Sequence, residues 1–165
     1  LALARADTGR LTIERSPFDL ADTIALVLEQ YAPAATEAGV AFKDEAAPAP
    51  LRGDEDLLVQ VLVNLVDNAL VHTPAGGTIA VGCRREPGRV RLWAADTGSG
   101  IAPADLAHVF DRFYRADSGR ARAHGGAGLG LSISRAIVEA HGGTIALTST
   151  KGRGTRVDVR LPVEG

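Results

Sequence analysis

The spacing of hydrophobic and polar residues along the chain predicts both helices and strands. Apolar residues recur with the helical period in residues 18–38, 54–72 and 129–140. They alternate with polar residues, as in half-buried strands, in residues 11–15, 40–43, 78–84, 89–95, 144–149 and 155–161. Turns at 86–88 and 151–154 join the last four of these segments into two hairpins. This order predicts an α+β fold, a two-layer α/β sandwich in which three main helices cover one face of a mixed five-stranded sheet.

Proline, alanine and acidic residues mark the expected ends of these elements. Pro33 lies inside the first helical segment and should kink it or end it early, because proline lacks an amide hydrogen. Residues 46–50 are rich in proline and alanine, which is typical of a linker. The next helical segment opens with three acids at 54–56, where the helix dipole favours them. The stripe of this helix that should face the core is Leu58, Val61, Leu62, Leu65 and Ala69.

The composition limits the partners that the chain can have. Its net charge of −2 gives no strong field toward nucleic acid or lipid, and no apolar run is long enough to span a membrane. We therefore expect no nucleic-acid partner and no membrane contact by this chain. The single cysteine, Cys83, excludes an internal disulfide, and its place in a strand predicts a buried, inert thiol. The chain contains no methionine, so we expect it to be an excised part of a longer protein.

Two asparagines lie on one face of the second predicted helix. Asn64 and Asn68 are four residues apart, and Gln60 precedes them by one turn. Their face lies roughly a quarter-turn from the centre of the apolar stripe, at the edge of the core where a cleft would be lined. Amide oxygens are hard neutral ligands that suit Mg²⁺ together with water and phosphate. The alternative is a polar flank of an amphipathic helix, and the pair alone does not exclude it.

A glycine-containing motif, Asp-Thr-Gly-Ser-Gly-Ile at 96–101, follows a predicted strand. A carboxylate at Asp96 can accept a hydrogen bond from the exocyclic amine of adenine, whereas guanine presents an oxygen at that place. Gly98 and Gly100 permit positive φ and a close approach to a flat ring. The alternative is an ordinary turn. An aspartic protease is excluded, because it needs two such motifs and the chain has one.

A second glycine motif, formed by Gly126, Gly128 and Gly130, precedes the third predicted helix. A flexible loop and the amides of a helix N-terminus can hold phosphates. The spacing does not fit the dinucleotide-binding pattern, and no Gly-Lys-Ser/Thr exists for a P-loop. A helix cap after a loop is the plainer alternative.

Together, in this order, the motifs resemble those of the catalytic ATP-binding domain of bacterial sensor histidine kinases, in the superfamily of gyrase-type ATPases. The resemblance covers residues 16–163, nearly the whole chain. The matching segments are 54–73 with the N box, 96–101 and 126–131 with the two G boxes, 110–115 with the F box, and Gly152, Gly154 and Thr155 with the turn before the last strand. The resemblance implies the Bergerat fold, with a mobile ATP lid at about 102–125.

The resemblance also implies roles for the matching positions. Asn68 would ligate Mg²⁺, and Asp96 would bind the adenine amine. Asn64, Arg112 and Arg115 would form the catalytic set, with the two arginines near the phosphates. The residues expected to contact the nucleotide are Asn64, Asn68, His72, Asp96, Gly98, Gly100, Ile101, Tyr114, Gly126, Gly128, Leu129, Gly130, Leu131 and Thr155.

The implied reaction needs a second domain. Residues 1–9 would be the end of a dimerisation and phosphoacceptor helix, and residues 10–165 the ATP-binding domain. The γ-phosphoryl of Mg-ATP would pass to a histidine of that dimerisation domain, in a homodimer, and then to a response regulator. The implied location is cytoplasmic, as part of a bacterial inner-membrane sensor.

Two departures from ATP-hydrolysing or typical relatives affect the expected chemistry. ATP-hydrolysing relatives carry a glutamate where Asn64 stands, and an amide has no useful basicity, so we expect little hydrolysis. Val71 stands where the family often has a lysine that touches phosphate. A missing charged hydrogen bond typically costs about 1.5–3 kcal/mol, which predicts weaker ATP binding.

Other residues and two further functions complete the predictions. None of the histidines is followed by the acid of a phosphoacceptor motif, and we expect His108, His124 and His141 on the lid or on turn surfaces. Trp93 should pack rather than stack on a base.

Two alternative functions stay open: a serine kinase and binding module of the anti-sigma-factor type, and a degenerate nucleotide-sensing module.

Overall fold

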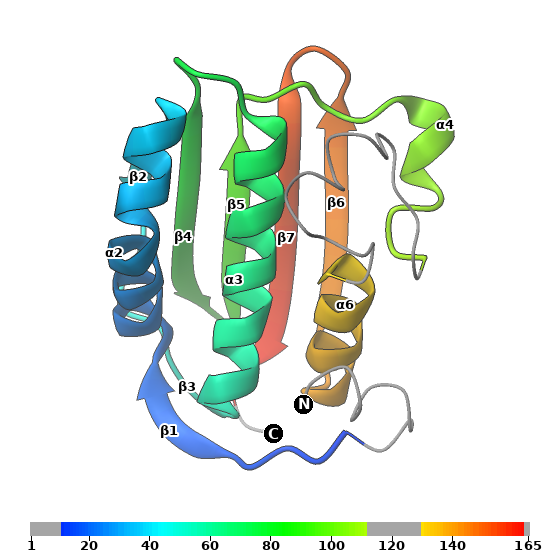
Figure 1. Ribbon diagram of the computed structural model, residues 1–165. Helices are drawn as coiled ribbons and strands as arrows, with labels where there is room; N and C mark the ends of the chain where they lie inside the picture. The colour runs from blue at the N-terminus through cyan, green and yellow to red at the C-terminus, as the bar shows by residue number, and fades with distance from the viewer. Residues whose placement is uncertain (1–10, 112–129, 164–165) are drawn as a thin grey trace.

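The computed structural model describes residues 11–111 and 130–163, and the text below concerns these (Figure 1). A five-stranded sheet has the order β2-β4-β5-β7-β6. Its strands are β2 (Ala41–Asp44), β4 (Thr78–Glu86), β5 (Arg89–Asp96), β6 (Thr144–Thr150) and β7 (Gly154–Pro162). The pair β2–β4 is parallel and the other pairs are antiparallel. The predicted mixed sheet and both predicted hairpins are confirmed.

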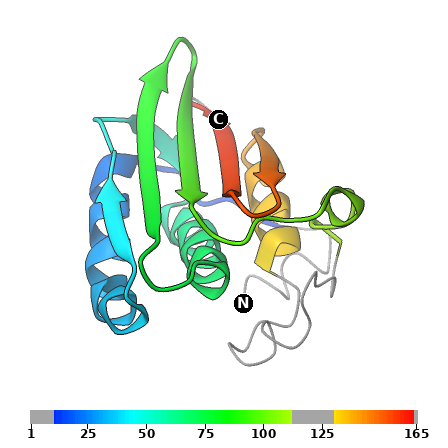
Figure 2. The ribbon, with the colours of Figure 1, turned by 90° about the horizontal axis from the view of Figure 1, so that it is seen from above.

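Three long helices lie side by side on one face of this sheet, as Figures 1 and 2 show. They are α2 (Leu20–Ala38), α3 (Glu55–His72) and α6 (Gly130–Ala140). The other face carries no helix among the described residues (Figure 2). All five residues of the predicted apolar stripe of α3 are buried. The two-layer sandwich is therefore confirmed, with its core between the helices and one face of the sheet.

Helix α3 is fixed at both ends. Asp54 is its N-cap, and Oδ1 of Asp54 accepts a hydrogen bond from the amide of Leu57 at 3.2 Å. At the other end, the hydroxyl of Thr73 donates to the carbonyl of Ala69 at 2.7 Å. These caps set the position of the polar face of α3 relative to the ends of β5 and β7.

The structure corrects two predictions about the first part of the chain. Residues 11–15 form no strand. Instead, β1 (Ser16–Asp19) pairs antiparallel with β3 (Pro50–Gly53) in a separate two-stranded sheet. The Pro/Ala segment is thus a linker only up to Ala49, because Leu51 is buried and extends as a strand. The carboxylate of Asp19 joins the two parts, since its Oδ1 accepts from the amides of Ala21 and Ala49, each at 2.9 Å.

Pro33 does not end helix α2, which continues to Ala38. Proline removes the hydrogen bond to the carbonyl of Glu29, four residues earlier. Glu29 and Pro33 are both exposed, so water can solvate the freed carbonyl.

None of the helices in residues 11–111 and 130–163 has the length and hydrophobicity that a membrane span requires.

Candidate functional site

Asp96 is the last residue of β5 and pairs with Ile79 of β4 and Thr155 of β7. Its Oδ1 accepts hydrogen bonds from the amides of Gly98, at 2.8 Å, and Thr155, at 3.3 Å. No residue in the described ranges donates to its Oδ2. Burial raises the pKa of the Asp96 carboxyl, while the two amides and the neighbouring His72 oppose this rise. One carboxylate oxygen is therefore held by the backbone and the other is open to a ligand.

The two glycines after Asp96 are required for different reasons. Gly100 has a φ of 70°, as predicted. Gly98 is not among the positive-φ glycines, which corrects the prediction for that residue. A Cβ at Gly98 would collide with the carbonyl of His72, so the loop needs glycine there for close approach. The amide of Ser99 donates to the same carbonyl at 3.0 Å, which fixes the loop against the end of α3.

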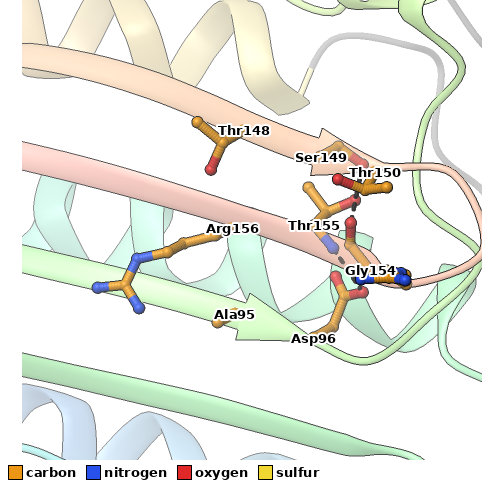
Figure 3. Close-up of a pocket in the computed structure, with 9 residues that line it drawn as sticks. Ala95, Asp96, Thr148, Ser149, Thr150, Gly154, Thr155 and Arg156 are labelled. Carbon is orange, nitrogen blue, oxygen red and sulfur yellow. Dashed lines mark hydrogen bonds between the residues drawn. The ribbon is translucent and has the colours of Figure 1, made fainter.

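The turn between β6 and β7 lies next to Asp96 (Figure 3). The hydroxyl oxygen of Ser149 accepts from the amide of Ile101 at 2.7 Å. It also lies 2.9 Å from the carbonyl oxygen of Gly154 and 2.9 Å from the hydroxyl oxygen of Thr155. Ser149 therefore joins the loop after Asp96 to the β6–β7 turn. The sequence contained a signal for it, since Ser149 is a polar residue in the register of inward-facing Ile145 and Leu147.

Asn64 lies between helices α3 and α6. Its Nδ2 donates to the carbonyl of Gly130 at 3.2 Å and to the hydroxyl of Ser134 at 3.3 Å. Its Oδ1 accepts from the side-chain amide of Gln60 at 2.9 Å. Both ends of this amide are thus used inside the protein, and Asn64 positions the first turn of α6.

Asn68 differs from Asn64 in its surroundings. It is half-buried, and its amide has no hydrogen-bond partner within residues 11–111 and 130–163. Val71, also half-buried, follows it by one turn on the same face of α3. His72 ends the helix near Asp96 and affects the charge of that carboxyl. The end of α3 therefore brings an unpaired amide close to the open carboxylate at the end of the central strand β5.

The beginning of the predicted lid is anchored to the domain. It contains the short helix α4 (Pro103–Leu106), followed by the buried Val109. The guanidinium of Arg135, on α6, lies 5.8 Å from the ring centroid of Phe110. Phe110 is the first residue of the predicted F box.

Several predicted site residues fall outside the described ranges. These are Arg112, Tyr114, Arg115, Gly126, Gly128 and Leu129. Gly130 is the first residue of α6, and Leu131 packs partly buried against the core. The described residues thus bring together the predicted adenine side of the site, the end of α3 and the start of α6.

A pocket of about 320 Å³ also touches Asp96, but it opens on the face of the sheet away from the helices (Figure 3). Ala95, Arg156 and Thr148 line it and stand in register on three neighbouring strands. Their neighbours along those strands face the helical layer instead. Because Asn68 lies on the helical side, this pocket does not join Asp96 to the end of α3. We therefore place the candidate ligand site on the helical side.

Trp93 and Cys83 lie as predicted. The Trp93 ring lies on the open face, with the guanidiniums of Arg91 and Arg156 at 5.8 and 5.5 Å from its centroid. Its indole N–H donates to Glu45 at 2.8 Å. Cys83 is fully buried, and burial raises the pKa of its thiol to about 12, so the thiol stays protonated and inert.

The prediction that His141 lies on a turn surface is wrong. His141 is 2% exposed and packs at the start of α3. Its Nε2 accepts from the amide of Asp54 at 3.0 Å, and its Nδ1 lies 2.8 Å from the carbonyl oxygen of Ile137. His108 is exposed, as predicted, and His124 lies outside the described residues.

Comparison with known proteins identifies the family. The family described as histidine kinase-, DNA gyrase B-, and HSP90-like ATPase matches residues 53–165. The chain belongs to this family. The resemblance stated from the motifs is therefore confirmed. Because this is an ATP-binding family, the match indicates that the ligand is ATP.

Curated relatives of this chain are sensor histidine kinases. The chain is 40% identical over 162 residues to the sensor histidine kinase CusS of Escherichia coli K12, covering 98% of this chain and 34% of CusS. It is 38% identical over 164 residues to the sensor-like histidine kinase SenX3 of Mycobacterium tuberculosis H37Rv, covering 98% of this chain and 40% of SenX3. The chain thus spans between a third and two fifths of the length of these relatives.

Solved structures show the same fold. Full-length ShkA in complex with AMPPNP has a TM-score of 0.84 and 30% identity, covering 98% of this chain and 34% of that one. The mycobacterial sensor histidine kinase MprB has a TM-score of 0.79 and 31% identity, covering 90% of this chain and 99% of that one. These neighbours confirm the predicted Bergerat-type sandwich.

Proposed function

We propose that the chain is the ATP-binding catalytic domain of a sensor histidine kinase. It holds Mg-ATP and transfers the γ-phosphoryl group to a histidine on a dimerisation domain of the same protein, from which a response regulator receives it. The observation that carries this proposal is Asp96, whose Oδ1 is held by two backbone amides while its Oδ2 remains open. Such a carboxylate accepts a hydrogen bond from the amine of adenine and disfavours the oxygen of guanine.

The residues at the end of α3 fit a magnesium ion. Asn68 offers a hard amide oxygen that no described residue uses. No group of three or more histidine, cysteine, aspartate or glutamate residues in residues 11–111 and 130–163 is arranged to hold a metal by itself. Asn68 would therefore hold Mg²⁺ together with the phosphates of the nucleotide. The ion would neutralise charge on the phosphates during transfer.

Asn64 supports transfer rather than hydrolysis. Its amide carries no basic group, and its hydrogen bonds to Gly130 and Ser134 already engage its Nδ2. The side chain thus cannot activate water. Its role is to hold the first turn of α6 beside α3, where the amides of a helix N-terminus favour phosphate oxygens.

The domain arrangement and location complete the proposal. Residues 1–9 would end a phosphoacceptor helix, and about 102–125 would form the ATP lid, with Arg112 and Arg115 near the phosphates. The relatives favour this proposal over the serine-kinase alternative, since they are sensor histidine kinases. We place the domain on the cytoplasmic side of a bacterial sensor protein.

Calorimetry and phosphotransfer test the proposal. The chain should bind Mg-ATP but not Mg-GTP, and should release phosphate from ATP at a rate near background. With the histidine-bearing helical domain of the same protein, label from γ-³²P-ATP should appear as an acid-labile, base-stable phosphohistidine. Acid-stable label on a serine would favour the alternative kinase, and no heat at millimolar ATP would mean a degenerate domain.

Replacing Val71 with lysine should increase the affinity for Mg-ATP roughly tenfold, because one new charged hydrogen bond to a phosphate is available. Val71 lies one turn beyond Asn68, within reach of the same ligand groups. Calorimetry at fixed salt measures the change. Ala75→Lys is the matched control. Ala75 is exposed, and this substitution adds the same charge beyond the end of α3. Equal gains in both variants would show a general charge effect instead of a phosphate contact.

A further inference from the structure

We infer that Ser149 is a positioning residue that holds the adenine-binding carboxylate of Asp96 in place through Thr155 and Ile101. Ser149 was not among the residues expected to contact the nucleotide. The inference rests on the proposed function, because it concerns how the proposed adenine site is built.

The hydroxyl of Ser149 forms a complete set of hydrogen bonds, of which those with Gly154 and Thr155 are drawn in Figure 3. The carbonyl oxygen of Gly154, 2.9 Å away, can only accept, so Ser149 donates its single hydrogen there. The amide of Ile101 donates to Ser149 at 2.7 Å. The hydroxyl of Thr155, 2.9 Å away, must then donate to Ser149 as well. One side chain thus binds two segments that are far apart in the sequence.

These two segments enclose Asp96. On the hairpin side, the amide of Thr155 donates to Oδ1 of Asp96 at 3.3 Å. Gly154 lies so close that a Cβ there would collide with the carbonyl of Asp96. On the loop side, Ile101 is buried and closes the turn that begins at Asp96. A shift of either segment would therefore release Oδ1 of Asp96 and move Oδ2, the carboxylate oxygen that faces the ligand.

The same contacts influence the charge of Asp96. Burial raises the pKa of this carboxyl, and the amide of Gly98, the amide of Thr155 and the neighbouring His72 counteract the rise. When Ser149 no longer fixes Thr155, this amide should donate less well to Oδ1. The pKa of Asp96 should then rise further, so that the carboxyl loses its negative charge at a higher pH.

The test is calorimetric titration of the chain with Mg-ATP from pH 5 to pH 8. Ser149→Ala should bind roughly tenfold more weakly at pH 8, and its loss of affinity on acidification should begin at a higher pH than in the wild type. Ser149→Thr, which keeps the hydroxyl, should recover most of the affinity. Thr148→Ala is the matched control, because Thr148 is exposed on the opposite face of the same strand.

The outcomes separate the inference from the proposed function. The positioning role would be overturned if the affinity of Ser149→Ala for Mg-ATP were within twofold of the wild-type value and its pH profile were unchanged. Weaker binding with an unchanged pH profile would also overturn it, since it would show a general loss of structure. If Ser149→Ala does not fold, Thr155→Val removes the donating hydroxyl but keeps the amide, and must show the same shift in the pH profile. A wild type that does not bind Mg-ATP refutes the proposed function instead.

Discussion

Asp96→Asn should lose roughly 100-fold or more in affinity for Mg-ATP, the largest effect on binding that we expect. The amides of Gly98 and Thr155 both donate to Oδ1 of Asp96, so the asparagine must keep its oxygen at that position. Its NH₂ group then replaces Oδ2 and faces the amine of adenine. Two donors oppose each other, and the charge of the acceptor is lost as well. Calorimetry with Mg-ATP measures the change.

Asp22→Asn serves as the control for this prediction. Asp22 is exposed in the first turn of α2, and its replacement removes the same charge far from the site. The control should bind Mg-ATP as the wild type does. Thermal unfolding of Asp96→Asn shows whether the domain stays folded. If folded Asp96→Asn kept wild-type affinity, Asp96 would not be the adenine-binding group.

Most of the fold was predictable because its signals are local and periodic. The alternation in β4 to β7 and the apolar stripe of α3 each follow from a run of neighbouring residues. The exceptions depend on the environment. Pro33 is tolerated because its side of α2 faces water, and Leu51 extends as a strand because β1 pairs with it. Neither solvent exposure nor pairing with a distant segment can be read from those few residues alone.

The sequence could name candidate residues for the site, but it could not show which hydrogen bonds they form. The motifs named Asp96, Asn64 and Asn68 as site residues with different roles, but they did not indicate which of these side chains already have partners inside the protein. Asn64 is held by Gly130, 66 positions later in the chain, whereas Asn68 has no partner among the described residues. The hydroxyl of Ser149 accepts a hydrogen bond from the amide of Ile101, 48 positions earlier in the chain. Such long-range hydrogen bonds set which polar groups remain available to a ligand, and a local pattern cannot show them.

His141→Ala should lower the free energy of unfolding by about 3–4 kcal/mol at pH 8, the largest effect on stability that we expect. The substitution leaves a cavity in a site that is 2% exposed. It also leaves the amide of Asp54 without its acceptor, at the N-terminus of the helix that carries Asn64 and Asn68. Because this amide donates to Nε2, the hydrogen of the neutral ring must be on Nδ1, facing Ile137.

The same histidine should make stability depend on pH. Burial lowers the pKa of His141 in the folded protein, so the unfolded chain binds the proton first as the pH falls below about 6.5. The stabilisation is complete above that pH and is lost as the pH decreases toward the folded-state pKa. A protonated Nε2 would also oppose the amide of Asp54, donor against donor.

Urea unfolding of both proteins between pH 8 and pH 5 tests this prediction. The difference in stability between the wild type and His141→Ala should be largest at pH 8 and should shrink below pH 6.5, because only the wild type loses this contribution. His108→Ala, at an exposed histidine, should change stability by less than about 0.5 kcal/mol at every pH. A constant difference across the range would show that His141 acts through packing alone, without its hydrogen bond to Asp54 controlling the response to acid.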